Sequence, residues 1–333
     1  MQEFEWSSPA TVEQAVKLLA EIQADDPNEN ARPMAGGQDL LTTMKEHILR
    51  PQRVVNLKLI EGLDHIDGTA ATGLKIGALA KLHTIETHPE ILASFPGLAE
   101  AAHSIASVQL RNQGTIGGNL CQRPRCWYFR LEEAFCLKKG GDTCFAENGE
   151  NKYHAIFGGG PSFIVHPSDL ATMLTALDAT LTITGPKGRR DMPVASFFHL
   201  PRKDASTENV LGIGDLVTEI QIPASAMAAR STYVKFKERS SLDFAMAAAA
   251  AAVEVGSDGN VKQARLVLGG VAPIPWRVPA AEAALIGKPL NAPAISAVAE
   301  IALDGAKPLA KNAYKIPLAK ALMRRALTQL AKA

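Results

Sequence analysis

Two glycine-rich stretches and one group of cysteines constrain this chain more than any other feature. The first stretch, AGGQDL, spans residues 35–40, and the second, TIGGN at residues 115–119, comes directly before the cysteines. All four cysteines of the chain lie within 24 residues, in the spacing C-x4-C-x9-C-x7-C. Glycine lets the backbone adopt a positive φ and lets a ligand approach closely, and successive N–H groups can then bind a diphosphate. The combination predicts a phosphate-bearing cofactor beside a metal or redox centre.

Both signals also have a plainer interpretation. Neither glycine stretch matches the G-x-G-x-x-G dinucleotide fingerprint or the phosphate loop of nucleotide hydrolases, so each could be a simple tight turn. The cysteines could form disulfides, as they do in small secreted domains. A chain of 333 residues can bury a core without such crosslinks, and this favours metal ligation or redox chemistry.

Length and composition narrow the class of protein. The chain has 333 residues, 47% of them hydrophobic and 21% charged, which is typical of a globular protein with two or three domains. A net charge of +1 gives no basic excess for binding nucleic acid. No apolar run approaches the roughly 20 residues that span a bilayer. The N-terminus carries acidic residues where a signal peptide carries basic ones, so we expect a cytoplasmic protein, or a periplasmic one if a signal-bearing partner exports the folded complex.

The sequence pattern predicts two domains. The second domain contains two long predicted strands on either side of an Asp-Gly turn. Residues 247–252 are all alanine and favour a helix by propensity, but the alternation of residue types on both sides predicts a strand. The expected boundaries are 1–225 for the first domain, with subdomains of about 1–60 and 61–225 and the cysteine-containing segment at about 121–165, and 226–333 for the second.

Four motifs together resemble a known protein family. They are AGGQDLL, RNQGTIGGN, HPSDL at residues 166–170, and Y-x-K-x-x-x-R beginning at Tyr233. In this combination they resemble the FAD-binding medium subunits of the xanthine dehydrogenase and carbon monoxide dehydrogenase family, which are molybdenum hydroxylases. The resemblance covers nearly the whole chain. It implies an α+β fold, with a two-subdomain FAD-binding domain of the vanillyl-alcohol-oxidase type followed by a small antiparallel sheet with helices.

The resemblance also implies which residues bind FAD. Both glycine stretches would contact the diphosphate, and Asp169 matches the family's acidic residue near the polar chain of the flavin. Lys235 matches a lysine beside the flavin ring, where a cation stabilises the reduced, anionic N1. Taken alone, Asp169 could be a helix N-cap and Lys235 an exposed strand residue. The implied FAD-binding residues are Pro33, Met34, Ala35, Gly36, Gly37, Gln38, Asp39, Leu40, Thr115, Ile116, Gly117, Gly118, Asn119, Asp169, Val217 and Lys235.

The cysteine-containing segment is an insertion relative to simpler members of the family. Asn119 and Asp169 are fifty residues apart here, whereas simpler relatives join these motifs by a short segment. The insertion resembles that of the aldehyde oxidoreductases and 4-hydroxybenzoyl-CoA reductases whose flavin subunit holds an additional 4Fe–4S cluster on thiolate ligands. Relatives have leucine at position 121 and often a cysteine near Ser162, so the fourth ligand stays open, and structural zinc is an alternative. The implied metal ligands are Cys121, Cys126, Cys136 and Cys144.

These implications predict an electron-transfer subunit of a molybdenum hydroxylase of the aldehyde oxidoreductase or xanthine dehydrogenase type. Electrons would pass from a molybdenum centre on a large partner, through 2Fe–2S clusters on a small partner, to FAD on this chain and then to a small-molecule acceptor such as NAD, dioxygen or a quinone. Substrate oxidation would occur on the partner, in a heterotrimer or a dimer of heterotrimers. Two alternatives are a self-contained FAD oxidase and a zinc-stapled binding protein without flavin.

Overall fold

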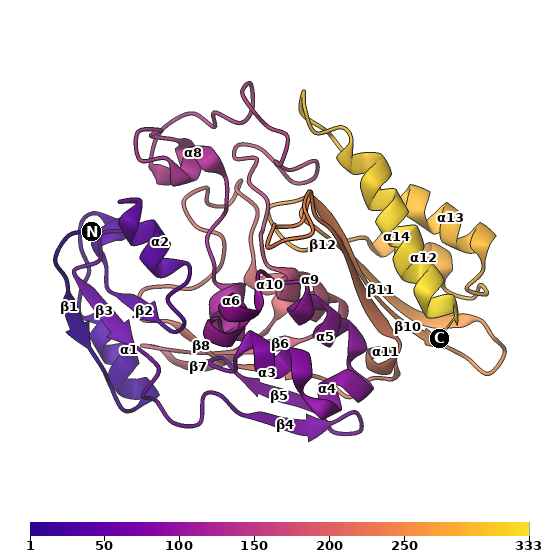
Figure 1. The fold of residues 1–333 in the computed structure, drawn as a ribbon, viewed down its shortest axis with the longest axis horizontal. Coiled ribbons are helices and arrows are strands. Elements are labelled where there is room, and N and C mark those ends of the chain that lie inside the picture. Colours follow the sequence, from indigo (N-terminus) through magenta and orange to yellow (C-terminus); the bar gives the residue numbers. More distant parts are fainter. Residues whose placement is uncertain (333) are drawn as a thin grey trace.

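The computed structural model describes residues 1–332, and its N-terminal part is a small parallel sheet with one helix packed on it (Figure 1). The elements of this N-terminal unit are β1 (Glu5–Ser7), α1 (Val12–Ala20), η1 (Pro27–Glu29), β2 (Arg32–Met34), α2 (Leu40–Lys45) and β3 (Arg53–Asn56). Strand β3 lies between β1 and β2 and is parallel to both. Helix α1 begins after Thr11, whose side chain accepts a hydrogen bond from the Gln14 N–H, and it buries Ala15 and Leu19 against the sheet.

A five-stranded antiparallel sheet forms the middle of the protein, in the order β4-β5-β8-β6-β7. Its strands are β4 (Ile66–Thr69), β5 (Gly73–Gly77), β6 (Thr180–Gly185), β7 (Gly188–Pro193) and β8 (Leu216–Ile222). The accompanying helices are α3 (Leu82–Thr87), α4 (Pro89–Ser94), α5 (Pro96–His103), α6 (Val108–Gln113), α7 (Ile116–Leu120), α9 (Asp169–Ala176) and α10 (Val194–Phe197). Helix α9 is buried along its whole length because it packs between this sheet and the C-terminal one.

The alanine run lies in a strand, as expected. The C-terminal sheet is antiparallel in the order β12-β11-β10-β9, and its strands are β9 (Ser231–Phe236), β10 (Ala247–Val255), β11 (Val261–Gly269) and β12 (Trp276–Arg277). Even-numbered alanines of β10 pack in the core that contains α9, and odd-numbered alanines pack in the core of the C-terminal helices. Both faces of β10 are therefore covered, and small side chains let the two layers approach closely.

One expectation about this sheet is wrong. The sequence predicted a single long strand before the Asp-Gly turn, but β9 and β10 are separate, adjacent strands in antiparallel register. The connection between them, residues 237–246, contains Ser240, Ser241 and Asp243. Short polar side chains of this kind favour turns because they hydrogen-bond to nearby backbone.

Helices complete the C-terminal domain, namely α11 (Ala226–Ala229), α12 (Pro279–Leu285), α13 (Ala292–Ile301) and α14 (Lys315–Lys332). Helix α14 packs along β10 and β9 (Figure 1). Arg230 holds the end of α14, because its Nε and Nη2 donate to the carbonyl oxygen of Leu330 at 3.1 and 2.8 Å. The segment around α11, which follows the expected domain boundary, is thus part of the packed structure.

The cysteine-containing insertion is mostly irregular and contains only α8 (Trp127–Arg130) and η2 (Leu137–Lys139) among its described residues. Figure 1 shows it as a long looping segment on the side of the molecule where α8 is labelled. The C-terminal domain holds one end of it, because Lys315 Nζ donates to the carbonyl oxygen of Tyr153 at 2.8 Å and Asn312 Nδ2 to that of His154 at 3.0 Å.

The structure confirms the expected α+β fold class, with two sheets in the first part of the chain and an antiparallel sheet with helices at the end. Within residues 1–332, no helix has the length and apolar character needed to cross a membrane.

Candidate functional site

A cavity of about 750 Å³ opens between the N-terminal unit and the middle of the protein. Fifteen of the sixteen residues that the resemblance assigns to FAD line it, including both glycine stretches, Asp169, Val217 and Lys235. The exception is Ile116, which is fully buried in the core of the five-stranded sheet and its helices. The cavity therefore brings together motifs that lie up to about two hundred residues apart in the sequence.

The first glycine stretch has the geometry of an anion-binding loop. Gly37 has φ 72°, in the left-handed region that glycine adopts without strain. A Cβ on Gly36 would lie 2.4 Å from the carbonyl oxygen of Gln113, so only glycine fits where the two stretches meet. Among residues 1–332, nothing accepts a hydrogen bond from the N–H groups of Gly36, Gly37 and Gln38. These free donors at the cavity wall are available to a phosphate.

The second glycine stretch differs from the expected open turn. Its residues form the short helix α7, and the Thr115 Oγ1 caps it by accepting a hydrogen bond from the Gly118 N–H at 3.2 Å. The Gly117 N–H donates to the carbonyl oxygen of Ala78 at 2.9 Å. These two N–H groups are already hydrogen-bonded within the protein, so they are not free for a phosphate, and the expected contact of this stretch with the diphosphate stays a prediction. A Cβ on Gly117 would lie 2.9 Å from Ala78, whereas a Cβ on Gly118 would meet only Thr115 Oγ1, at 3.1 Å. Gly117 therefore permits packing, and Gly118 leaves room in the cavity.

Asp169 and Lys235 form a buried ion pair in the cavity wall. Lys235 Nζ donates to Asp169 Oδ2 at 2.7 Å and to the carbonyl oxygen of Ser104 at 3.1 Å, and Tyr233 Oη donates to Asp169 Oδ1 at 2.5 Å. Burial, reinforced by the Asp169 charge, raises the pKa of Tyr233 well above its usual value. Ser168 is the N-cap of α9 and Lys235 is largely buried, so the plain alternatives for Asp169 and Lys235 are wrong.

The four cysteines occupy two different environments. Cys126 and Cys136 pack with Phe129 in a small apolar cluster. Burial raises the pKa of Cys126 to about 11, and the neighbouring Cys136 and Cys144 thiols contribute to the rise. Cys121 instead lines the 750 Å³ cavity and packs against the main core, where burial raises its pKa to about 12. All four thiols are free, and among residues 1–332 no set of three or more His, Cys, Asp and Glu side chains is arranged to hold a metal ion.

A histidine that the sequence did not single out lies beside the cysteines. His154 Nε2 is 3.2 Å from Cys126 Sγ, and its side chain is buried. Burial lowers the pKa of His154 to about 4, so the ring is neutral at pH 7. Ser162, whose hydroxyl oxygen is another candidate for the fourth ligand, is also buried. The one signal for His154 in the sequence is its place ten residues after Cys144.

Comparison with known families decides the identity of the chain. Residues 2–225 match the family described as the FAD binding domain in molybdopterin dehydrogenase, and residues 231–330 match the CO dehydrogenase flavoprotein C-terminal domain. The chain belongs to the FAD-binding subunits of the xanthine dehydrogenase and carbon monoxide dehydrogenase family. This confirms the family that the four motifs suggested, and with it an oxidoreductase flavoprotein of the molybdenum hydroxylase type.

Relatives of this flavoprotein subunit span most of its length. It is 35% identical over 302 residues to the FAD-binding subunit of an aldehyde oxidoreductase from Escherichia coli K12, covering 90% of this chain and 91% of that one. It is 27% identical to the medium chain of glyceraldehyde dehydrogenase from Sulfolobus acidocaldarius, covering 87% and 83%. Its structure resembles that of carbon monoxide dehydrogenase from Hydrogenophaga pseudoflava, with a TM-score of 0.75 and 29% identity over 98% of this chain and 96% of that chain.

Asp39 links the flavin cavity of this subunit to the insertion. Asp39 Oδ1 forms ion pairs with Arg125 at 2.9 Å and with Arg130 at 2.7 Å. Asp39 Oδ2 accepts a hydrogen bond from the Arg123 backbone N–H at 2.7 Å. Both carboxylate oxygens are therefore engaged by the protein, although the side chain lines the cavity. Asp39 thus positions the insertion against the first glycine stretch.

Replacing Asp39 by alanine should loosen the insertion. The change leaves Arg125 without its carboxylate and Arg130 with Glu46 as its remaining carboxylate partner, which we expect to lower the free energy of unfolding by about 1–3 kcal/mol. Urea unfolding of the purified subunit measures this. The matched control is Glu300→Ala, which removes an exposed carboxylate that also pairs with two cations, Lys320 and Arg324, and should lower the free energy of unfolding less than Asp39→Ala does. Equal losses in the two variants would contradict a linking role for Asp39.

Arg32 is a cavity residue that the motif reasoning missed. It lies at the start of β2, lines the cavity, and donates from Nη2 to the carbonyl oxygen of Pro27 at 2.6 Å. Burial, with the nearby Arg123, lowers its pKa to about 10, so it stays cationic at pH 7. A cation next to the free amides of the first glycine stretch suits a diphosphate. A signal was present in the sequence, because Arg32 directly precedes the residues assigned to that loop.

Proposed function

We propose that this flavoprotein subunit transfers electrons from a molybdenum-containing partner to an external acceptor. The observation that carries the proposal is the single cavity that unites the free amides of the first glycine stretch with the buried Asp169–Lys235 pair. The partners would be a large subunit with the molybdenum cofactor and a small subunit with 2Fe–2S clusters. The identity of 35% with an aldehyde oxidoreductase subunit supports an aldehyde as the substrate oxidised on the large partner.

The residues of the cavity suit FAD. The N–H groups of Gly36, Gly37 and Gln38 would donate to the diphosphate, and Arg32 would offset its charge. Gly118 keeps the wall of the cavity free of side-chain atoms. Bound FAD supplies the capacity to accept and release electron pairs. Lys235, held in place by Asp169, would provide a positive charge for the reduced ring.

We also propose that the insertion holds a 4Fe–4S cluster on Cys126, Cys136 and Cys144. Support comes from the common environment of these thiols, since the pKa of Cys126 already responds to the other two. Burial makes an isolated thiolate unfavourable here, and binding to iron would supply the compensating positive charge. Thiolates are the usual ligands of such clusters, and four are usual.

The fourth ligand is the open element of this proposal. Cys121 faces the flavin cavity and the main core rather than the apolar cluster of Cys126 and Cys136. His154 is in direct contact with Cys126, either as a ligand or as an N–H donor to the thiolate. Ser162 occupies the position where relatives often have cysteine. Hydrogen bonds to a cluster's sulfur ligands shift its reduction potential, so His154 matters in both roles.

The visible absorption spectrum of the purified chain, with its iron and acid-labile sulfide content, tests this function against the two alternatives. Flavin bands together with iron and sulfide in equal amounts are the expected result. Flavin without iron would instead support a self-contained FAD oxidase. A colourless protein that contains zinc would support a binding protein whose cysteines hold structural zinc, and it would overturn the proposed function.

A further inference from the structure

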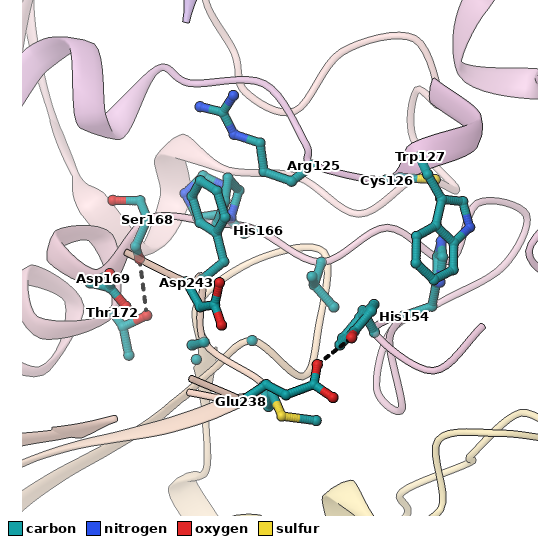
Figure 2. A pocket seen from close by; sticks show the side chains of 18 of the residues that line it. Arg125, Cys126, Trp127, His154, His166, Ser168, Asp169, Thr172, Glu238 and Asp243 are labelled. Atoms are coloured by element: carbon teal, nitrogen blue, oxygen red, sulfur yellow. Dashed lines mark hydrogen bonds between the residues drawn. The ribbon is translucent and has the colours of Figure 1, made fainter. Parts of the chain in front are cut away.

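A second cavity, of about 630 Å³, lies between the insertion and the C-terminal domain. Figure 2 shows Trp127 and His154 of the insertion on one side of it and His166 and Asp169 on the other. The end of β11 and the connection between β9 and β10 complete the lining. Glu238 and Asp243 belong to this connection. Residues of two family motifs, among them His166 and Arg239, and the proposed cluster ligand Cys126 lie in its wall, but the roles given to them above do not fill this space.

The second cavity adjoins the flavin cavity. Five residues line both, namely Arg125, Pro167, Asp169, Asp243 and Phe244. The guanidinium of Arg125 lies 5.0 Å from the ring centre of Phe244, so these two side chains form part of the wall between the cavities. A molecule in the second cavity would therefore lie next to the flavin cavity, where an electron acceptor has to bind.

The charges around the second cavity disfavour an anionic ligand. Its lining contains three carboxylates, from Asp169, Glu238 and Asp243, against two guanidiniums, from Arg125 and Arg239. Arg125 is paired with Asp39 at 2.9 Å, and Arg239 with Asp243 at 2.7 Å. The carboxylates are paired as well, Asp169 with Lys235 at 2.7 Å and Glu238 with Lys152 at 2.6 Å. Because every charge of the wall already has an opposite charge beside it, the diphosphate of a nicotinamide dinucleotide would find no cation free to pair with it.

His166 offers hydrogen bonds that the protein does not use. Its side chain is 5% exposed, it lines the cavity, and within residues 1–332 neither ring nitrogen has a hydrogen-bond partner. Burial lowers the pKa of His166 to about 4, so the neutral ring presents one N–H donor and one acceptor nitrogen at pH 7. Buried polar groups are normally paired, and an unpaired one in a cavity wall points to a ligand.

The rest of the lining suits a flat, apolar ring. Trp127 and Phe244 are both partly exposed, and Val165 and Met246 add apolar surface. Trp127 packs edge-on against Tyr153 with ring centres 5.4 Å apart, which fixes its orientation. Aromatic side chains stack favourably on planar ligands.

We propose that the second cavity binds a neutral quinone as the electron acceptor, with its ring against Trp127 and a ring carbonyl accepting a hydrogen bond from His166. This inference rests on the proposed function, because the acceptor needs reduced flavin beside it. Reduction of a quinone to the quinol takes two electrons and two protons. Oxidation of the reduced, anionic flavin supplies both electrons and one proton, and water supplies the second proton. The inference also distinguishes this subunit from one built to reduce NAD.

Binding of duroquinone to the FAD-loaded subunit, measured by equilibrium dialysis, tests the inference. The ring of duroquinone is fully substituted, so cysteines have no free position to attack. We expect one saturable site per chain. The His166→Leu and Trp127→Ala substitutions should each raise its dissociation constant for duroquinone at least tenfold. Trp127 is partly exposed, so its replacement does not threaten the fold. The matched control is Trp6→Ala, which removes an exposed tryptophan of the N-terminal unit and should leave binding unchanged.

Two outcomes would overturn the inference. One is the absence of saturable duroquinone binding to protein that contains flavin, and the other is unchanged affinity in both cavity variants. Flavin content is measured on the same samples and reports on the proposed function separately. Displacement of duroquinone by NAD would also contradict a site for a neutral acceptor.

Discussion

The Gly118→Val variant is expected to fold normally and to lose most of its FAD. Gly118 lines the flavin cavity, and a Cβ there would meet only the Thr115 Oγ1, at 3.1 Å. The valine side chain therefore extends into space that the cofactor needs. Overpacking of this kind costs about 1–3 kcal/mol, which corresponds to roughly tenfold to hundredfold weaker FAD binding. Flavin absorbance per chain after purification, followed by FAD titration, measures the effect.

Two related variants separate a cofactor effect from damage to the fold. Gly118→Ala adds only the Cβ and should retain more flavin than the valine variant. Gly117→Ala places its Cβ 2.9 Å from Ala78, so it should disturb the packing of α7 and lower the free energy of unfolding by about 1–3 kcal/mol. Gly118→Val protein with full flavin content would show that α7 serves only a structural purpose.

Local sequence patterns predicted the parts of this fold that depend on neighbouring residues. The strands β10 and β11 were expected from the residues on either side of an Asp-Gly turn, and the structure pairs them in antiparallel register. The strand at β10 was expected against alanine's helix propensity. The packing of helices on both of its faces explains why small residues occur there. These strands were predictable because the alternation of residue types along the sequence agrees with the side chains that the structure buries.

Features that depend on distant partners were not predictable from the sequence. Asp39 lies in a glycine stretch, and this position predicts a ligand-binding residue. In the structure, however, its carboxylate is bound by three arginines more than eighty residues away, two through their side chains and one through its backbone N–H. The Gly117 N–H looked free because its acceptor, the carbonyl oxygen of Ala78, lies just past the end of β5 and far from it in the sequence. Likewise, the spacing of the cysteines gave no sign that Cys121 packs against a different core from Cys126.

Serine replacements at Cys126, Cys136 and Cys144 should each remove most of the iron from the subunit. A 4Fe–4S cluster contributes about four irons per chain, and loss of one thiolate ligand destabilises the whole cluster. Serine keeps the shape of the side chain but offers a hydroxyl that deprotonates far less readily than a thiol. Iron and zinc analysis of each purified variant measures the result. Unchanged iron in all three variants, or zinc in place of iron, would show that the proposed cluster is wrong.

Cys121→Leu is the matched control for the cluster variants, and it also decides the role of the cysteine nearest the flavin cavity. The thiol packs against the main core, where free cysteine serves well as a small apolar side chain. We therefore expect this variant to keep both its iron and its flavin. Loss of iron would instead make Cys121 the fourth ligand. Because Cys121 lines the flavin cavity, such a ligand would couple cluster loss to flavin loss, and the two contents would then fall together.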